Sequence, residues 1–254
     1  KMSEKLVVKL GEAGIVRIVF IRHANAAPPG TKGKGEYGTI HDWQRDDQLR
    51  PLTEKGRKQA AVAREWFSKE IGVSSNKVLI TSGARRASET LQLMAEQKAD
   101  KSGFLSSMFG GCSSANTVGM QVAMDLLDGL HPAGISPKCE ELFDRHGYAP
   151  LEKFHGMEGG EAAFAEYAEI ICERLGGVAE RMRLTPGTGL SLFGHAVFLN
   201  AVALALARAW GADPATVATL VSLDLAEAEG ILVERAAGGC AVRHLTVRPH
   251  PLWA

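Results

Sequence analysis

Short apolar runs that end in polar residues recur along this 254-residue chain. They include Ile-Val-Phe-Ile at 18–21, Val-Leu-Ile at 78–80 and Gly-Leu-Ser-Leu-Phe at 189–193. Runs of this length, bounded by polar residues, are typical of buried strands in a parallel sheet. Between and after these runs the apolar spacing becomes helical. It predicts helices over residues 54–69, from the first turn at Arg86 to about 97, and over 196–210.

Further elements follow the same alternation. The pattern predicts a strand over 122–127, a helix over 160–183, and two strands over 229–236 and 241–247 that are joined by a turn at Gly238-Gly239. Strands that alternate with helices favour an α/β fold. We therefore expect a three-layer α/β/α sandwich with a mostly parallel central sheet.

Three segments lack any period: residues 26–50, 98–119 and 128–160. We interpret them as insertions or loops, which often carry substrate specificity. A solvated loop explains Lys32 and Lys34 of the first segment more simply than an anion contact does. No Pro/Ser-rich linker divides the chain, so we expect one domain over 1–254 with a core at about 16–247.

Composition narrows the choice of partners and compartment. The 29 basic and 29 acidic residues cancel, which argues against binding to nucleic acid or to an anionic membrane. The apolar 196–210 segment is too short to span a bilayer, and the N-terminus has no signal-like apolar core. Scattered cysteines without a CxxC pair indicate free thiols, no zinc site and a cytoplasmic protein. They are Cys112, Cys139, Cys172 and Cys240.

Four residues whose side chains could bind an anion or react follow predicted strands. Arg22 and His23 end the first strand, Arg86 lies in the helix after the second, and His195 follows the strand at 189–194. Ligands of open α/β sheets bind beyond the carboxyl ends of the strands. Arginine binds phosphate with a planar charged fork, and a neutral imidazole is a nucleophile or a base. Taken alone, an Arg-His pair also suits an exposed strand end, and we interpret Arg85 as exposed.

The order of these residues is more specific than any one of them. Between them lie Pro51-Leu52-Thr53-Glu54-Lys55-Gly56 and Arg86-Ala87-x-x-Thr90. Together, from about residue 16 to 247, this set resembles the histidine phosphatase superfamily, in particular its phosphoglycerate-mutase-like branch.

The resemblance implies roles for individual residues. His23 is the expected nucleophile, which forms a phosphohistidine that water hydrolyses. Arg22, Arg86 and His195 form the expected phosphate pocket, with Asn25 and Ala196 as further substrate contacts. No metal and no cofactor are expected, because the arginines supply the positive charge. Ala24 stands where the family commonly has Gly.

The match between this sequence and the family pattern is poorest at the expected general acid. The family's Leu-x-Glu motif has no clean counterpart in Cys-Glu-Glu-Leu-Phe-Asp at 139–144. We expect Glu141 to be the acid, with Asp144 and Glu140 as alternatives. The stretch also resembles smaller phosphohistidine phosphatases, which do not rely on the same acid, because a phosphoramidate leaving group is expelled more easily.

The resulting hypothesis is a metal-independent phosphatase that acts on phosphomonoesters or phosphohistidine through a covalent phosphohistidine on His23. Its partner would be a small phosphorylated substrate or a phosphoprotein. Two alternatives stay open: a phosphoglycerate-type mutase, and a catalytically silent phosphate-binding or scaffold module. The sequence leaves the physiological substrate and the oligomeric state undetermined.

Overall fold

The computed structural model describes residues 10, 14–28, 47–71, 78–95, 136–184, 186–236, 238–248 and 250–253. All structural statements below refer to these residues. The strand expected at 122–127, the segment 98–119 and most of the loop 26–50, with Lys32 and Lys34, lie outside them.

A five-stranded sheet forms the centre of the described structure, in the order β2-β3-β1-β4-β5. Its strands are β1 (Arg17–Arg22), β2 (Val78–Thr81), β3 (Gly189–Gly194), β4 (Gly230–Ala236) and β5 (Gly239–Leu245). The β2–β3 and β3–β1 pairs are parallel, whereas β1–β4 and β4–β5 are antiparallel. The expected mostly parallel sheet is therefore correct for β2-β3-β1 only. Strand β5 runs antiparallel to β4 because the short turn at Gly238 joins them as a hairpin, and such a turn permits only antiparallel pairing.

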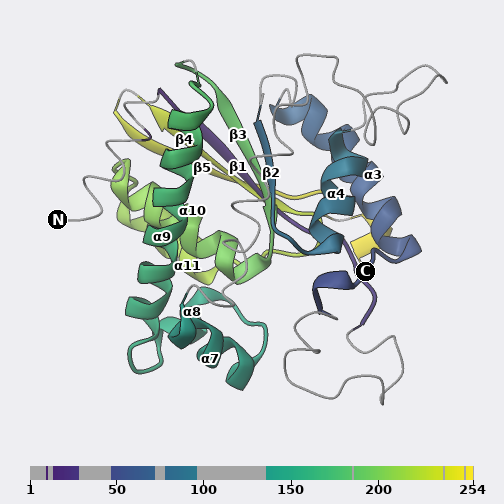
Figure 1. Ribbon diagram of the computed structural model, residues 1–254, viewed down its shortest axis with the longest axis horizontal. Coiled ribbons are helices and arrows are strands. Elements are labelled where there is room, and N and C mark those ends of the chain that lie inside the picture. The colour runs from purple at the N-terminus through teal and green to yellow at the C-terminus, as the bar shows by residue number, and fades with distance from the viewer. Residues whose placement is uncertain are drawn as a thin grey trace.

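Helices cover both faces of this sheet (Figure 1). They are α3 (Glu54–Ile71), α4 (Arg85–Ala95), α7 (Pro137–His146), α8 (Leu151–His155), α9 (Gly160–Arg181), α10 (Ala196–Ala209) and α11 (Pro214–Ser222), followed by the 3-10 turn η2 (Pro251–Trp253). In Figure 1, α9 and α10 lie on one side of the strands and α3 and α4 on the other. The predicted three-layer α/β/α architecture is confirmed.

Alternation along the strands divides the core into two halves. Ile18 and Phe20 of β1 pack in the cluster beneath α9 and α10. Val19 and Ile21 point the opposite way, into the cluster beneath α3 and α4. Successive strand side chains point to opposite faces, so a strand covered on both sides must be apolar throughout. This requirement explains the continuous apolar run at 18–21.

Two helices occupy the segment 128–160, which we expected to be irregular. Helix α7 begins where Ser136 accepts a hydrogen bond from the Cys139 backbone N–H, with Pro137 in the first turn. It ends at Gly147, whose φ is 67°. Ser at the N-cap, Pro at the first position and Gly after the end are ordinary helix boundary signals. The expectation was wrong because α7 and α8 are too short for a clear period.

Two further observations bear on the expectations from composition. No helix in the described part of the chain is long and apolar enough to cross a membrane. Cys139, Cys172 and Cys240 are free thiols, whereas Cys112 lies outside the described residues.

The first turn of α3 lies against the loop that follows β1. A Cβ at Gly56 would be 2.0 Å from the carbonyl oxygen of Asn25. The backbone N–H of Thr53 donates to this same oxygen at 3.0 Å. Only glycine permits such a close approach of two backbones, so the Pro-Leu-Thr-Glu-Lys-Gly stretch holds the loop beyond β1 in place.

We expect Gly56→Ala to lower the free energy of unfolding by about 2 kcal/mol, because the added methyl group overpacks this contact. Gly177→Ala in α9 is the control, since a Cβ there meets nothing within 4 Å. It should be neutral or stabilising by about 0.5–1 kcal/mol. Urea unfolding of both variants measures the difference, and equal stabilities would contradict the close contact.

A buried carboxylate holds the end of the chain against the loop that precedes β4. The side chain of Glu229 is 0% exposed. It accepts hydrogen bonds from Arg248 Nε at 2.6 Å, from His244 Nε2 at 3.0 Å and from Thr246 Oγ1. Burial opposes the ionisation of Glu229, but these hydrogen bonds outweigh it and lower its pKa from 4.5 to about 2.

Because this pKa is lower in the folded state, Glu229 stabilises the protein fully above pH 4.5, and the contribution is lost as the pH falls towards 2. We expect Glu229→Gln to lower stability by about 3 kcal/mol at pH 7, and the difference from wild type to shrink towards pH 2.5. Glu234→Gln is the matched control on β4, because Glu234 is partly exposed and pairs with Arg17 at the surface. It should change stability by less than about 1 kcal/mol. A pH-independent effect of Glu229→Gln in urea unfolding would contradict this assignment.

Candidate active site

The register of three parallel strands brings the two predicted histidines together. Arg22 pairs with Gly194 across β1 and β3, and the backbone N–H of His23 donates to the Gly194 carbonyl at 2.9 Å. His195 follows at once, and its ring centroid lies 5.3 Å from that of His23 in an edge-to-face arrangement. Both imidazoles thus leave the same edge of the sheet, at the carboxyl ends of adjacent strands.

The ring of His23 has a defined orientation. Its Nδ1 lies 2.8 Å from the Ala24 carbonyl oxygen, which only accepts, so Nδ1 carries the proton and Nε2 keeps its lone pair. Burial lowers the pKa of His23 well below 6.5, and the charges of Arg86, Arg22 and Arg50 lower it further. His23 is therefore neutral at neutral pH, with a nucleophilic nitrogen.

Arg86 and His195 contact each other directly. Arg86 Nη2 lies 3.3 Å from His195 Nδ1, and His195 Nε2 lies 3.1 Å from Ser82 Oγ. A guanidinium group only donates, so Nδ1 of His195 accepts and its Nε2–H donates to Ser82. Thr90 fixes the start of α4, because its hydroxyl donates to the Arg86 carbonyl and accepts from the Ala24 N–H. This explains the spacing in Arg86-Ala87-x-x-Thr90.

Asp47 and Arg50 complete the polar cluster, although the sequence analysis did not single them out. Asp47 accepts hydrogen bonds from Arg86 Nη2 at 2.9 Å and from Arg50 Nη1 at 2.8 Å. Burial opposes its ionisation, but the charge of Arg86 and the hydrogen bonds from both arginines hold the pKa of Asp47 below 3.8. The sequence feature that could have indicated them is their place within the four residues before Pro51-Leu52-Thr53.

Arg22 is held from two sides. Its Nη1 donates to the Leu225 carbonyl at 2.6 Å, and its guanidinium carbon lies 4.5 Å from the centre of the Tyr148 ring. Tyr148 in turn donates to Asp224 Oδ1 at 2.6 Å. The Nε–H groups of Arg22 and Arg86 are buried and have no hydrogen-bond partner among the described residues. Buried donors of this kind are unfavourable unless water or a ligand supplies an acceptor.

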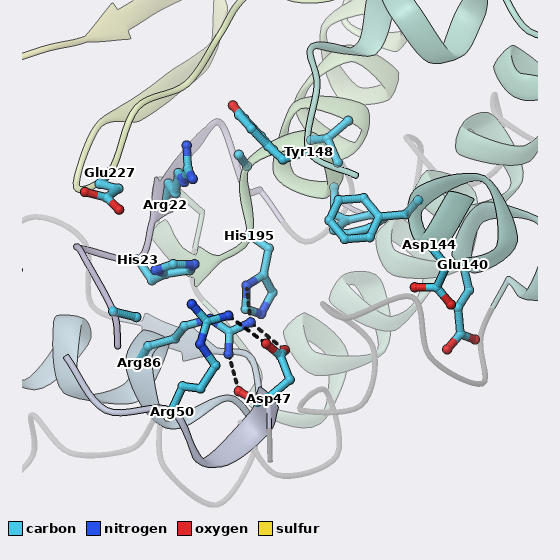
Figure 2. A pocket seen from close by; sticks show the side chains of 15 residues that line it. Arg22, His23, Asp47, Arg50, Arg86, Glu140, Asp144, Tyr148, His195 and Glu227 are labelled. Atoms are coloured by element: carbon cyan, nitrogen blue, oxygen red, sulfur yellow. Dashed lines mark hydrogen bonds and ion pairs between the residues drawn. The ribbon is translucent and has the colours of Figure 1, made fainter. Parts of the chain in front are cut away.

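These side chains surround one cavity of about 210 Å³ (Figure 2). The described residues that line it come from the strand ends, from the 47–50 segment, from α7 with the loop after it, and from the start of α10. They are Arg22, His23, Ala26, Asp47, Arg50, Arg86, Glu140, Phe143, Asp144, Tyr148, His195, Ala196, Val197, Phe198 and Glu227. The cavity has an arginine-rich end at the histidines and an aromatic, acidic wall on α7.

The structure brings Arg22, His23, Arg86, His195 and Ala196 to this cavity, as expected from the sequence. Asn25 does not line it. The Asn25 side chain donates to Glu227 Oε1 at 2.8 Å and accepts from Thr53 Oγ1 at 2.5 Å. It thus organises the loop after β1 and not the cavity surface.

Glu141, expected to be the general acid, also lies outside the cavity. Its carboxylate is 63% exposed and forms an ion pair with Arg145 on the solvent side of α7. The alternatives Glu140 and Asp144 do line the cavity. One residue along a helix turns the side chain by about 100°, so Glu140 and its neighbour Glu141 face different surroundings.

Comparison with solved structures finds similar chains of low sequence identity. One is a protein provisionally named an alpha-ribazole-5'-P phosphatase from Escherichia coli, with a TM-score of 0.48, 15% identity, and 92% of this chain and 97% of that chain covered. A phosphoserine phosphatase from Entamoeba histolytica has a TM-score of 0.44 and 12% identity, with coverages of 91% and 98%. A mycobacterial glucosyl-3-phosphoglycerate phosphatase has a TM-score of 0.41 and 18% identity, with coverages of 90% and 96%. No curated protein gives a significant match.

A comparison with protein families matches one family to residues 18–103 of this chain. That segment contains β1, the loop after it, α3, β2 and α4, and with them Arg22, His23 and Arg86. Residues 18–103 of this chain match the histidine phosphatase superfamily (branch 1), which confirms the resemblance to that superfamily over this segment.

Proposed function

We propose that this protein is a phosphatase that hydrolyses phosphomonoesters or phosphohistidine, with His23 as the nucleophile. The observation that carries the proposal is a neutral imidazole with a free Nε2 lone pair inside an arginine-rich cavity. A nitrogen nucleophile and a set of guanidinium groups are the two parts that phosphoryl transfer needs when no metal takes part.

In the proposed first step, His23 Nε2 attacks phosphorus and the bond from phosphorus to the leaving oxygen breaks. The leaving oxygen takes up a proton, for which Glu140 and Asp144 are the candidates on the cavity wall. In the second step, the oxygen of a water molecule attacks phosphorus, and one proton of this water passes to the carboxylate that was left in the first step. The phosphorus–nitrogen bond then breaks, which releases inorganic phosphate and restores neutral His23.

Arg22, Arg86 and His195 are proposed to bind the phosphoryl oxygens in both steps. Preorganised donors of this kind stabilise the charge that develops in the transition state. Arg86 is 5% exposed and in contact with both Asp47 and His195, so its position is determined before substrate arrives. Phosphate must compete with Asp47 for Arg86, and this favours a dianionic group over a weaker anion.

The mutase alternative needs a second group of cations to hold a bisphosphate. In the described part of the chain, the wall opposite the arginines carries the carboxylates of Glu140 and Asp144 instead. This wall favours the phosphatase over the mutase. The silent-module alternative would not require a neutral His23 whose Nδ1–H is held by the Ala24 carbonyl.

The low pKa of His23 predicts an acid limit of activity. Protonation abolishes the nucleophile, so kcat/KM should fall as the pH drops through a value well below 6.5. Proton NMR of the imidazole resonances, with His23→Asn for assignment, measures the same pKa directly. A titration midpoint of His23 at or above 6.5 would contradict the neutral-nucleophile assignment.

Rapid-quench trapping with a radiolabelled aryl phosphate tests the covalent step. We expect acid-labile label on the peptide that contains His23, together with release of inorganic phosphate. His23→Asn should lose the label and reduce turnover about 10³-fold or more. His155→Asn, a change of the same kind on α8 that does not line the cavity, should keep both. Full turnover by His23→Asn would overturn the proposal.

A further inference from the structure

The cavity has two chemically distinct sides, and the second side is not needed to hold phosphate. Figure 2 shows Glu140 and Asp144 across the cavity from His23 and Arg22. The aromatic rings of Phe143 and Phe198 also line the cavity, and their centroids are 5.1 Å apart. A phosphoryl group bound at the arginines would direct its leaving group to this wall.

The positions on α7 explain why this wall is acidic and aromatic together. Glu140, Phe143 and Asp144 are spaced i, i+3 and i+4, so they share one face of the helix. Cys139 and Leu142 occupy the buried face, and Glu141 with Arg145 the solvent face. The contact of Phe143 with Phe198 fixes the rotation of α7 against α10. The two carboxylates are thereby held towards the cavity.

The charges of the described lining residues are unevenly distributed. Arg22, Arg50 and Arg86 lie at the phosphate end, together with two carboxylates: Asp47, which pairs with two of these arginines, and Glu227, which accepts a hydrogen bond from Asn25 (Figure 2). On the α7 side, the charged residues that line the cavity are Glu140 and Asp144. A second anion on the leaving group would face these carboxylates after a dianionic phosphate had taken up the arginines. A cation there would be attracted, and an apolar body would pack on the two rings.

We propose that the α7 wall selects phosphoryl substrates by the charge of the leaving group. The favoured class has an apolar, preferably aromatic, leaving group that is cationic or uncharged. Leaving groups that bear a carboxylate or a second phosphate are rejected. The inference rests on the proposed function, because it takes the arginine-rich end as the phosphate site.

Three aryl phosphates of similar size and similar leaving-group pKa test the selection. They are 4-(2-aminoethyl)phenyl phosphate, 4-ethylphenyl phosphate and 3-(4-phosphonooxyphenyl)propanoate, which carry a cation, no charge and an anion on the ring substituent. We expect kcat/KM to fall in that order, by about tenfold per step, for charges that interact across a partly solvated cavity.

The double variant Glu140→Gln/Asp144→Asn should reduce the ratio of kcat/KM between the cationic and anionic esters from about a hundredfold to less than about fivefold. This ratio does not depend on how much the variant changes overall activity. Glu141→Gln is the matched control, since it removes the same charge from the same helix on its solvent face. It should leave the ratio at the wild-type value.

Three outcomes distinguish a failure of the charge selection from a failure of the proposed phosphatase activity. A wild-type ratio near one, or a ratio that the double variant leaves unchanged, overturns the charge selection while turnover itself still supports the phosphatase. If none of the esters is turned over, calorimetric binding of the same three compounds decides. If the cationic ester binds most tightly, the neutral one less tightly and the anionic one least, the charge selection holds and the phosphatase proposal is wrong. If the three esters bind equally, both the charge selection and the phosphatase proposal are wrong.

Discussion

Parallel pairing of β1 with β3 is the contact on which the site depends. The pairing places Arg22 opposite Gly194, and one further backbone hydrogen bond joins His23 to Gly194. Two histidines 172 positions apart in the sequence thus leave the sheet side by side. On the other side of β3, the N–H of Ser82 donates to the Phe193 carbonyl in the same manner. A slip by one residue would turn either strand's side chains to the opposite face, and the buried apolar residues on both faces prevent it.

The second constraint is electrostatic. Three guanidinium groups surround the cavity, and both imidazoles lie among them. For His23, burial and the nearby positive charge lower the pKa. For His195, Nδ1 faces the guanidinium group of Arg86. Asp47 balances part of the positive charge through its ion pair with Arg86. A His23 ring with a lowered pKa and a cationic cavity therefore coexist, and the proposed phosphoryl transfer needs both.

Contacts outside the sheet hold the segments that surround the site. Glu229 holds the residues that precede β4 through its contacts with the C-terminal segment, and its carbonyl accepts from the N–H of Arg22. Gly56 allows α3 to press on the loop after β1. Helix α7 contributes one wall, and the Phe143–Phe198 contact orients it. Backbone contacts thus fix the strand ends that carry Arg22 and His23, and the α7 wall of the cavity comes from a separate layer.

The sequence by itself determined the strands, the longer helices and the residues at the strand ends. Apolar runs and helical spacing are local signals, and Arg22, His23, Arg86 and His195 are recognisable by type and order. It did not determine the antiparallel pairing of β4 with β1, nor helices α7 and α8, which are too short for a clear period. It missed Asp47, which gains its place through a contact with Arg86 from a distant helix, and Arg50, which donates a hydrogen bond to Asp47. Tertiary structure also decided that Glu140 lines the cavity and Glu141 faces solvent, since adjacent helical residues differ by a rotation that only packing against α10 could orient.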